Sequence, residues 1–408
     1  MLARVWGERQ LRHGGPIRYN LSTMTEPSPS TPVSPRTAPP SAAGAPAAQS
    51  GWWGRQTLLT RLLLISLGLL ILSGYLVSRD LGRVAPDFDG ATGWINSAPL
   101  QPADLRGKIV LVDFWTLSCI NCIRTFPYLK AWDEKYHDQG LVIVGVHTPE
   151  FLFEQDADRV KTAVEGFGLR YPIALDNNRA IWNGFANHWW PHKYLLDGTR
   201  KIRNEWIGEG GYDDIERAIQ RLLAEGRSTP MAREKVTVSA EPVEPKEIHT
   251  PEIYFGYGFV PDGGMYALGN QTAGLLSTQS AAYTLPNETA MEENRFYLAG
   301  PWNLQEEKAE LTGNAEGQIV LPYEAKAVHM VAERPGRAAP VYVLRDGRFL
   351  DPAIAGADIR FDSQGRSYVD INEGRMYRLI NDPAGYGRHR LLLKMNEKGF
   401  SIYTLTFG

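Results

Sequence analysis

Residues 109–122 decide the fold of this chain, and they read Ile109-Val110-Leu111-Val112-Asp113-Phe114-Trp115-Thr116-Leu117-Ser118-Cys119-Ile120-Asn121-Cys122. The first seven form a short apolar run rich in β-branched residues, which is typical of a buried strand. From Ile123 to Tyr136, apolar residues recur at near-helical spacing. The two cysteines of the chain are therefore predicted to lie between a buried strand and the first turn of a helix.

This position suits thiol–disulfide chemistry. The partial positive charge and the unpaired N–H groups at a helix start stabilise a thiolate at Cys119, and the thiolate is the attacking form in disulfide exchange. Cys122, one helical turn later, is close enough to resolve a mixed disulfide. The alternatives are a surface dithiol without a role and a zinc site. Zinc is disfavoured because there is no second cysteine pair and the histidines are scattered.

Residues 84–226 are predicted to form one α/β domain around this strand. The order βαβα followed by ββα predicts a parallel pair of strands that extends into a mixed sheet, with helices on both faces. The other elements are expected from apolar periodicity and capping residues. These are strands at Leu141–Val146, Lys193–Leu196 and Lys201–Ile207, and helices at Asp156–Phe167 and Asp213–Leu223.

Val112-Asp113-Phe114-Trp115 followed by Cys-x-x-Cys resembles the thioredoxin superfamily. The resemblance implies that Asp113 is a buried carboxylate that passes a proton to the second cysteine, rather than a carboxylate on a solvent face. It also implies that Pro127 kinks the first helix and that Pro191 is a cis-proline beside the active site. A cis X-Pro bond is rare enough that its position usually matters. Cys119, Cys122, Asp113 and Pro191 are thus the predicted catalytic residues, with a redox-active disulfide and no other cofactor.

Longer stretches narrow this resemblance. Ala85-Pro86-Asp87-Phe88 and Leu105–Val112 resemble the TlpA/ResA branch, which is exported, anchored in the membrane and used in cytochrome c maturation. Trp115–Thr125, Gly145–Phe151 and Trp190–Leu195 resemble the thioredoxin part of DipZ-type proteins, over residues 84–225 and onward to the C-terminus. DipZ-type proteins usually begin with a multi-span electron-conducting domain. This chain is predicted to have one span, so we expect a separate membrane protein to donate its electrons.

Several residues are predicted to contact a partner protein, and each has a plainer alternative as packing. Glu150 and His147 end the second parallel strand, where sites gather in open sheets, so both are expected near Cys119. Trp190 belongs to an aromatic group before Pro191, which is either core or an apolar rim beside which a partner backbone adds as a strand. The predicted substrate-binding residues are Trp115, Ile120, Asn121, Glu150 and Trp190. A metal site that includes His188 and His192 is disfavoured.

The first 78 residues predict a membrane anchor. Residues 1–56 predict a disordered tail, because Pro, Ser, Ala and Thr dominate its stretch Glu26–Ala48, and they contain a second candidate start at Met24. Residues 57–78 include Leu58–Val77, which reaches the ~20 residues that cross a bilayer. A cleaved signal peptide and a buried core helix are the alternatives. Arginine excess before the span places the tail in the cytoplasm, and therefore the redox domain outside the inner membrane of a bacterium.

The chain beyond the redox domain has a different residue pattern. Residues 227–250 are proline-rich and charged, and predict a linker. Residues 251–408 alternate short strand patterns with Gly, Asn and Asp turns, which predicts an antiparallel β-sandwich of jelly-roll type. This part resembles the carbohydrate-module-like sandwich of DipZ-type proteins, so carbohydrate is a candidate ligand. A scaffold or docking role is the alternative, because sugar sites need exposed aromatic rings and the domain has a single tryptophan, Trp302.

The sequence as a whole predicts a membrane-anchored thiol–disulfide oxidoreductase that acts on disulfide-bearing or dithiol proteins, as a reductase by family likeness. A formal net charge of −3 gives no reason to expect nucleic acid. Two alternatives remain. Thr116–Cys119 fits the T-x-x-C part of a thiol peroxidase pattern, although Val112 stands where that pattern has proline. The third possibility is a binding protein in which the C-terminal domain carries the function.

Overall fold

The computed structural model describes residues 63, 82–225, 234–238, 250–259, 267–270 and 280–408. The predicted tail (1–56), almost all of the predicted anchor (57–78) and most of the predicted linker (227–250) lie outside this set. Within the described residues, no helix is both long enough and apolar enough to cross a membrane.

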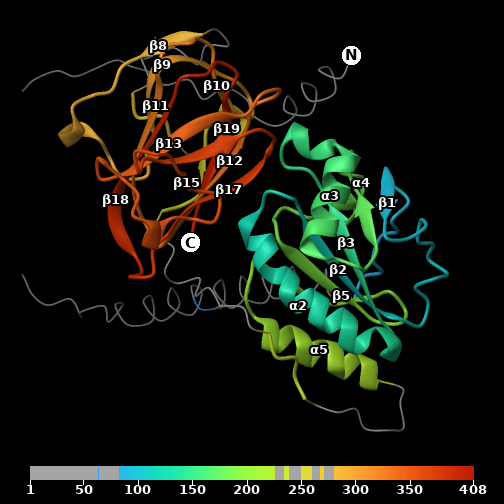
Figure 1. Cartoon of the computed structure of the whole chain (residues 1–408). Coiled ribbons are helices and arrows are strands. Elements are labelled where there is room, and N and C mark those ends of the chain that lie inside the picture. Colours follow the sequence, from blue (N-terminus) through green and yellow to red (C-terminus); the bar gives the residue numbers. More distant parts are fainter. Residues whose placement is uncertain (1–62, 64–81, 226–233, 239–249, 260–266, 271–279) are drawn as a thin grey trace, which may run out of the picture. The chain divides into compact units, whose positions relative to one another are not determined.

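The N-terminal domain of the described chain alternates strands and helices around the predicted central strand (Figure 1). In chain order its elements are β1 (Gly93–Ile95), β2 (Ile109–Trp115), α2 (Ile120–Tyr136), β3 (Leu141–His147), α3 (Ala157–Phe167), β4 (Ile173–Leu175), α4 (Ala180–Gly184), β5 (His192–Leu196), β6 (Ile202–Ile207) and α5 (Tyr212–Ala224). Two short 3₁₀ turns, His137–Gln139 and Leu152–Gln155, follow α2 and β3.

The six strands form one mixed sheet in the order β1-β4-β3-β2-β5-β6. Strands β2, β3 and β4 run parallel, whereas β1, β5 and β6 run antiparallel to their neighbours. The predicted mixed sheet is confirmed, but its parallel part has three strands instead of the expected pair. Strand β4 was missed because it is three residues long, too short to carry a recognisable period, and it is fixed by its pairing with β3.

Strand β2 is buried along its whole length, and its side chains divide between two apolar clusters. Leu111 and Trp115 join the cluster that contains Cys122 and buried residues of α2, α3 and α5. Val110, Val112 and Phe114 join the cluster on the other face, with Ile181 of α4. Successive strand residues point to opposite faces, so β2 forms the middle layer of both clusters. Figure 1 shows α2 and α5 side by side over one of these faces.

Helix α2 begins directly after Cys119, as predicted. Cys119 is the N-cap residue with an extended backbone (φ −78°, ψ 107°), and its sulfur accepts the N–H of Cys122 at 3.1 Å. The helix runs on through Pro127. Pro127, the position that the resemblance associates with a kink, thus lies inside the first helix. Proline has no N–H to donate there.

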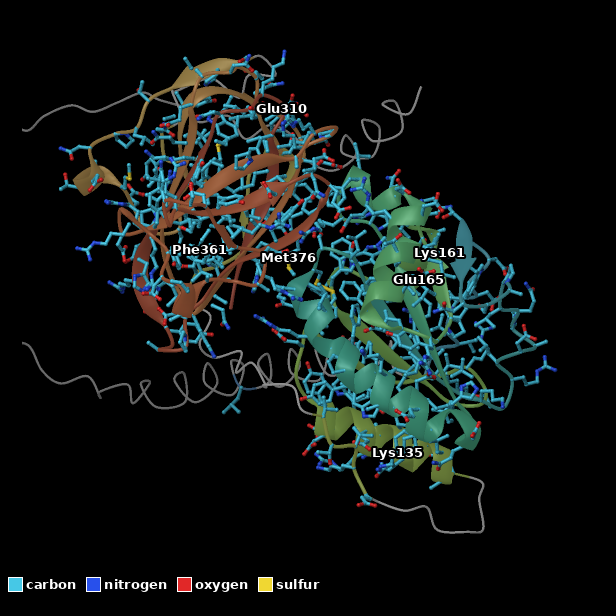
Figure 2. All side chains as sticks on the ribbon, viewed as in Figure 1. Lys135, Lys161, Glu165, Glu310, Phe361 and Met376 are labelled. Carbon is cyan, nitrogen blue, oxygen red and sulfur yellow. A yellow bond between two sulfur atoms is a disulfide. The ribbon has the colours of Figure 1, made fainter. Side chains whose placement is uncertain are left out.

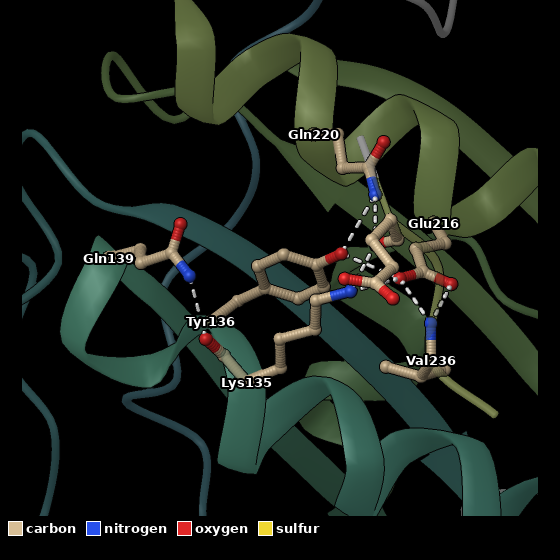
Figure 3. Close-up of polar contacts among 7 residues, drawn as sticks. Lys135, Tyr136, Gln139, Glu216, Gln220 and Val236 are labelled. Carbon is tan, nitrogen blue, oxygen red and sulfur yellow. Dashed lines mark hydrogen bonds and ion pairs between the residues drawn. The ribbon is translucent and has the colours of Figure 1, made fainter. Parts of the chain in front are cut away.

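The far end of α2 is tied to α5 and to residues 234–236 by one buried carboxylate (Figure 3). Glu216 is 2% exposed and accepts hydrogen bonds from the Tyr136 hydroxyl at 2.6 Å and the Val236 N–H at 2.9 Å. The Gln220 amide donates to the Tyr136 hydroxyl at 2.9 Å, and the Lys135 ammonium lies 3.5 Å from Glu216. The segment that follows the redox domain is therefore held at the end of α2 that is remote from the cysteines.

The C-terminal domain is all-β within the described residues, apart from three 3₁₀ turns. Every strand pair in it is antiparallel, in the path β15-β16-β13-β18-β11-β9-β10-β19-β12-β17. Its strands are β7 (Ile253–Tyr254), β8 (Ala281–Tyr283), β9 (Tyr297–Leu304), β10 (Ala309–Leu311), β11 (Gly317–Ala325), β12 (Ala327–Glu333), β13 (Ala339–Arg345), β14 (Arg348–Phe349), β15 (Arg360–Phe361), β16 (Ser367–Ile371), β17 (Arg375–Asn381), β18 (Gly387–Met395) and β19 (Ser401–Phe407).

One apolar core unites this domain. Strands near opposite ends of the path, β16 and β17, contribute Val369 and Tyr377 to the same buried cluster, so the sheet folds over on itself. Trp302 of β9 is completely buried in that cluster, and its indole N–H donates to the Ala299 carbonyl at 2.8 Å. The predicted antiparallel β-domain is confirmed, and its single tryptophan is a core residue.

Candidate active site

Cys119 and Cys122 form a disulfide at the start of α2, with their Cα atoms 5.3 Å apart. Cys119 is partly exposed, whereas Cys122 is completely buried among residues of the α2 face. The two sulfurs are therefore unequal. Of the two, only the Cys119 side is open to solvent.

Asp113 lies beneath this disulfide on the same face of the sheet. It stands between Leu111 and Trp115 along β2, and those two residues share a cluster with Cys122. Its carboxylate is completely buried, and burial raises the pKa of Asp113 above its usual value. A buried carboxyl with a raised pKa accepts and returns a proton more readily near neutral pH than an exposed one.

Lys193 is the charge partner of Asp113, and it was not foreseen from the sequence. The two residues are directly opposite on β2 and β5, and the Lys193 ammonium lies 3.1 Å from an Asp113 oxygen. Lys193 is only 1% exposed and lowers the pKa of Asp113 against the larger effect of burial. A charge pair removed from water costs several kcal/mol per ion before their attraction is counted, so the burial of Asp113 with Lys193 is costly for the fold.

The Trp190–Pro191 peptide bond is cis, at the start of β5. The Pro191 carbonyl accepts the N–H of Gly208 at 2.8 Å. Trp190 is partly buried and packs against the cluster that contains Cys122 and Trp115. The predicted cis-proline and the disulfide thus adjoin one apolar cluster.

Arg179 contacts the ring of Trp190. Its guanidinium lies 5.1 Å from the Trp190 ring and 5.3 Å from the Trp182 ring, within the range of cation–π attraction. It also donates to the Pro149 carbonyl at 2.9 Å. Trp189, the next residue of the loop, is 50% exposed. The predicted aromatic group therefore divides into buried members and an exposed rim.

Trp115 and Ile120 are 0% and 5% exposed. The predicted direct contact of these two residues with a partner does not fit that burial, and the surface beside the sulfurs comes from Asn121 and Trp190, which are partly exposed. The Trp115 ring lies 4.9 Å from the ring of His147, edge to face. Neither nitrogen of His147 has a hydrogen-bond partner among the described residues, and burial lowers the pKa of His147 to about 3. His147 is thus a neutral, packed ring behind Trp115.

Glu150 lies in the loop after β3, as expected for a residue at the carboxyl end of a parallel strand. Its carboxyl accepts the Tyr254 hydroxyl at 2.7 Å. Burial, followed by the neighbouring carboxylates Glu252 and Glu154, raises the pKa of Glu150 well above its usual value. Its connection to the cysteines is indirect, because its N–H donates to Glu154 at 2.7 Å.

Glu154 joins the loop after β3 to the residue before Cys119. One of its oxygens accepts two hydrogen bonds from Ser118, from the N–H at 3.1 Å and the hydroxyl at 2.7 Å. The sequence contained a signal that was not used, namely an acidic residue that follows the apolar run Phe151-Leu152-Phe153. Within the described residues no group of three or more His, Cys, Asp or Glu side chains is placed to hold a metal ion.

Comparison with known proteins matches both domains. Residues 81–204 match the family model "AhpC/TSA family", and residues 250–408 match "Thioredoxin like C-terminal domain". Protein DipZ of Mycobacterium tuberculosis is 38% identical over 278 residues, which cover 67% of this chain and 38% of that protein. The chain therefore spans less than half the length of this relative.

Two shorter relatives match a smaller share of the chain. Thiol-disulfide oxidoreductase YkuV of Bacillus subtilis is 29% identical over 145 residues, which cover 36% of this chain and 97% of YkuV. Thiol-disulfide oxidoreductase ResA of Bacillus thuringiensis is 25% identical over 164 residues, which cover 38% of this chain and 88% of ResA.

Replacement of Lys193 by methionine is expected to lower the free energy of unfolding by about 3–5 kcal/mol, because it leaves Asp113 buried without a counter-charge. The double variant Asp113→Leu/Lys193→Met is expected to regain most of that loss. Urea unfolding measures both, with the exposed Lys161→Met on α3 (Figure 2) as the matched control. A double variant as unstable as Lys193→Met would show that the two side chains are not coupled.

Replacement of His147 by phenylalanine is expected to reduce the loss of stability in acid. The imidazole is held neutral with a pKa of about 3, against 6.5 for an unfolded histidine, so wild-type stability is lost as pH falls from 6.5 toward 3. Between pH 7 and 4, urea midpoints should show the variant losing less stability than wild type by roughly 3 kcal/mol. Identical pH profiles for the two proteins would contradict a buried neutral His147.

Proposed function

Because this chain is a TlpA/ResA-like member of the thioredoxin superfamily, we propose that it is a thiol–disulfide oxidoreductase that exchanges the Cys119–Cys122 disulfide with partner proteins, and that the net reaction reduces the partner. The observation that carries the proposal is the pairing of an accessible sulfur with a buried one above a buried acid. The partners are proteins that bear a disulfide or a dithiol.

The reaction begins from the reduced cysteine pair. The Cys119 thiolate attacks one sulfur of the partner disulfide, forms a mixed disulfide and releases the partner's other sulfur as a thiolate, which takes up a proton. Cys122 then attacks the Cys119 sulfur, which forms the Cys119–Cys122 disulfide and releases the second partner thiolate. Two electrons and two protons pass from the cysteine pair to the partner. A dithiol protein reverses these steps and restores the reduced pair.

Asp113 supports the second step. Cys122 is completely buried, so water does not reach its proton, and a thiol must lose that proton to become a nucleophile. Asp113 lies on the same face of the sheet, and its raised pKa suits it to accept the proton and later return it. Lys193 supplies a positive charge that favours the ionised form of Asp113 between these events.

The rim beside Pro191 is the proposed contact with the partner chain. The exposed Trp189 and the partly exposed Trp190 give this rim an apolar surface next to the cluster that holds the disulfide. An extended partner segment that pairs there as an added strand would bring its disulfide to Cys119. We further propose that the predicted span at residues 57–78 anchors the domain outside the cytoplasm, where a separate membrane protein donates electrons.

Carbohydrate binding at the C-terminal domain is a second candidate function, and one feature of its surface favours it. Tyr342 and Tyr368 are register partners on β13 and β16, with ring centroids 6.1 Å apart. Phe349 on β14 lies 6.3 Å from Tyr342. These three rings form an aromatic patch on the outer face of the sheet, of the kind on which sugar rings stack.

Replacement of Cys122 by serine is expected to trap partner proteins on Cys119, because the mixed disulfide can no longer be resolved. The trapped species is measured as a reducible adduct on non-reducing gels and identified by mass spectrometry. Cys119→Ser is the matched control and should trap none, since the remaining thiol is buried. An absence of adducts with Cys122→Ser, together with peroxide consumption by the wild-type chain, would favour a thiol peroxidase.

Replacement of Tyr342 and Tyr368 together by alanine is expected to abolish retention of the chain on insoluble peptidoglycan, because it removes the centre of the aromatic patch. Lys394→Ala is the control, since Lys394 is the register partner of Tyr342 on β18. Sedimentation with increasing amounts of peptidoglycan gives the bound fraction. Equal sedimentation of wild type and the double variant would rule out this patch as the binding surface.

A further inference from the structure

Glu154 is a completely buried carboxylate with four hydrogen-bond donors around it. One oxygen accepts the Ser118 N–H at 3.1 Å and the Ser118 hydroxyl at 2.7 Å. The other oxygen accepts the N–H of Glu150 at 2.7 Å and that of Phe151 at 3.0 Å. The proposed mechanism gives this residue no role, although half of its bonds go to the residue that precedes Cys119.

The donor pattern identifies Glu154 as an anion. Three of its partners are backbone N–H groups, which can only donate, and both oxygens accept two bonds each. A protonated carboxyl needs an acceptor for its own O–H, whereas a carboxylate is satisfied by donors alone. Hydrogen bonds of this charge-assisted kind are about twice as strong as neutral ones. A negative charge is therefore buried in the protein and hydrogen-bonded to Ser118, the residue that precedes Cys119.

The other charges around the disulfide largely cancel. Asp113 is paired with Lys193, and Arg124 lies 3.3 Å from Glu209. His147 is neutral, because burial lowers its pKa to about 3. Glu154, by contrast, makes no ion pair within the part of the chain that the structure describes. Arg179 is attracted by Glu154 and also by Glu150, Asp176 and Glu307, so its single positive charge is shared among four carboxylates.

Two influences consequently act on Cys119 with opposite sign. The start of α2 favours a negative sulfur, since the Cys122 N–H points at the Cys119 sulfur at 3.1 Å. Glu154 opposes it, because two negative charges in a medium of low dielectric constant repel each other.

We propose that Glu154 is a positioning residue for Cys119, which fixes the turn that carries the attacking sulfur and disfavours its thiolate, so that the reduced pair releases its electrons more readily. The inference rests on the proposed function in taking Cys119 as the attacking sulfur. In the step concerned, two thiols become a disulfide while two electrons and two protons pass to the partner's disulfide. Repulsion of the Cys119 thiolate makes the reduced cysteine pair less stable relative to the disulfide, which favours transfer of its electrons to the partner.

The plain alternative is a structural one. Glu154 accepts the Phe151 N–H and so caps the 3₁₀ turn Leu152–Gln155. A residue that only caps this turn would change the stability of the chain without a change in the titration of Cys119. The thiol pKa of Cys119 therefore separates the two roles.

The test is Glu154→Gln in the full chain, in a Cys122→Ser background so that one thiol titrates. The variant keeps the shape of the side chain and removes its charge. The pKa of the Cys119 thiol, measured from thiolate absorbance or from alkylation rate against pH, is expected to fall by about one unit. With both cysteines present, and at a pH above the pKa of the Cys119 thiol in both proteins, the reduction potential is expected to rise by about 30 mV, the equivalent of that tenfold change.

Two further variants complete the test. Glu165→Gln, at an exposed position on α3 (Figure 2), should leave the Cys119 pKa unchanged. Ser118→Ala keeps the charge of Glu154 and removes the hydroxyl that partly neutralises it, so the Cys119 pKa should rise. If Glu154→Gln does not fold, Ser118→Ala decides alone, and a pKa that falls or stays the same overturns the proposal. An unchanged or raised pKa in a folded Glu154→Gln overturns it equally.

These titrations need no partner protein. A failure to trap partners with Cys122→Ser would therefore count against the proposed function and leave the Glu154 inference to be decided by the titrations.

Discussion

The constraint on which the redox domain depends is a charge pair buried in the middle of its sheet. Strand β2 is buried from Ile109 to Trp115, and six of its seven side chains are apolar. The seventh, Asp113, is compatible with such a strand only because β5 places Lys193 directly opposite, 3.1 Å away. The antiparallel pairing of β5 is thus more than a way to extend the sheet. It brings the balancing charge to the one position where the central strand needs it.

Around this pair the domain separates the two sulfurs by burial. The same turn exposes Cys119 and encloses Cys122, because α2 begins at the first cysteine and turns the second into the apolar cluster beneath. Below them lie Asp113 and Lys193, and beside them lies Glu154 with its four donors. The chemistry proposed for the chain therefore depends on charges held in places that water does not reach. Their effects are larger there than they would be at a surface.

The sequence was a good guide wherever structure depends on neighbours along the chain. The bounds of β2 coincide with the predicted strand Ile109–Trp115, because this stretch has a clear apolar pattern. The start of α2 was equally legible. Short elements were missed, namely the strands β1 and β4, which depend on a partner strand, and the five-residue helix α4. Lys193 and Glu154 were missed for a related reason, since each meets its partner through strand register or a loop contact across tens of residues. The predicted roles of Asp113 and Pro191 in catalysis remain predictions.

The contact that Glu216 makes with Tyr136 and Val236 places the attachment of the following segment far from the reactive cysteines. Tyr136 is the last residue of α2, about 25 Å along the helix from Cys119 at ~1.5 Å per residue. A pulling force transmitted through the chain after α5 acts first on the hydrogen bonds of Glu216 with Tyr136 and Val236. The disulfide lies at the opposite end of α2. Movement of whatever follows the redox domain can thus loosen one end of α2 while the reactive turn keeps its geometry.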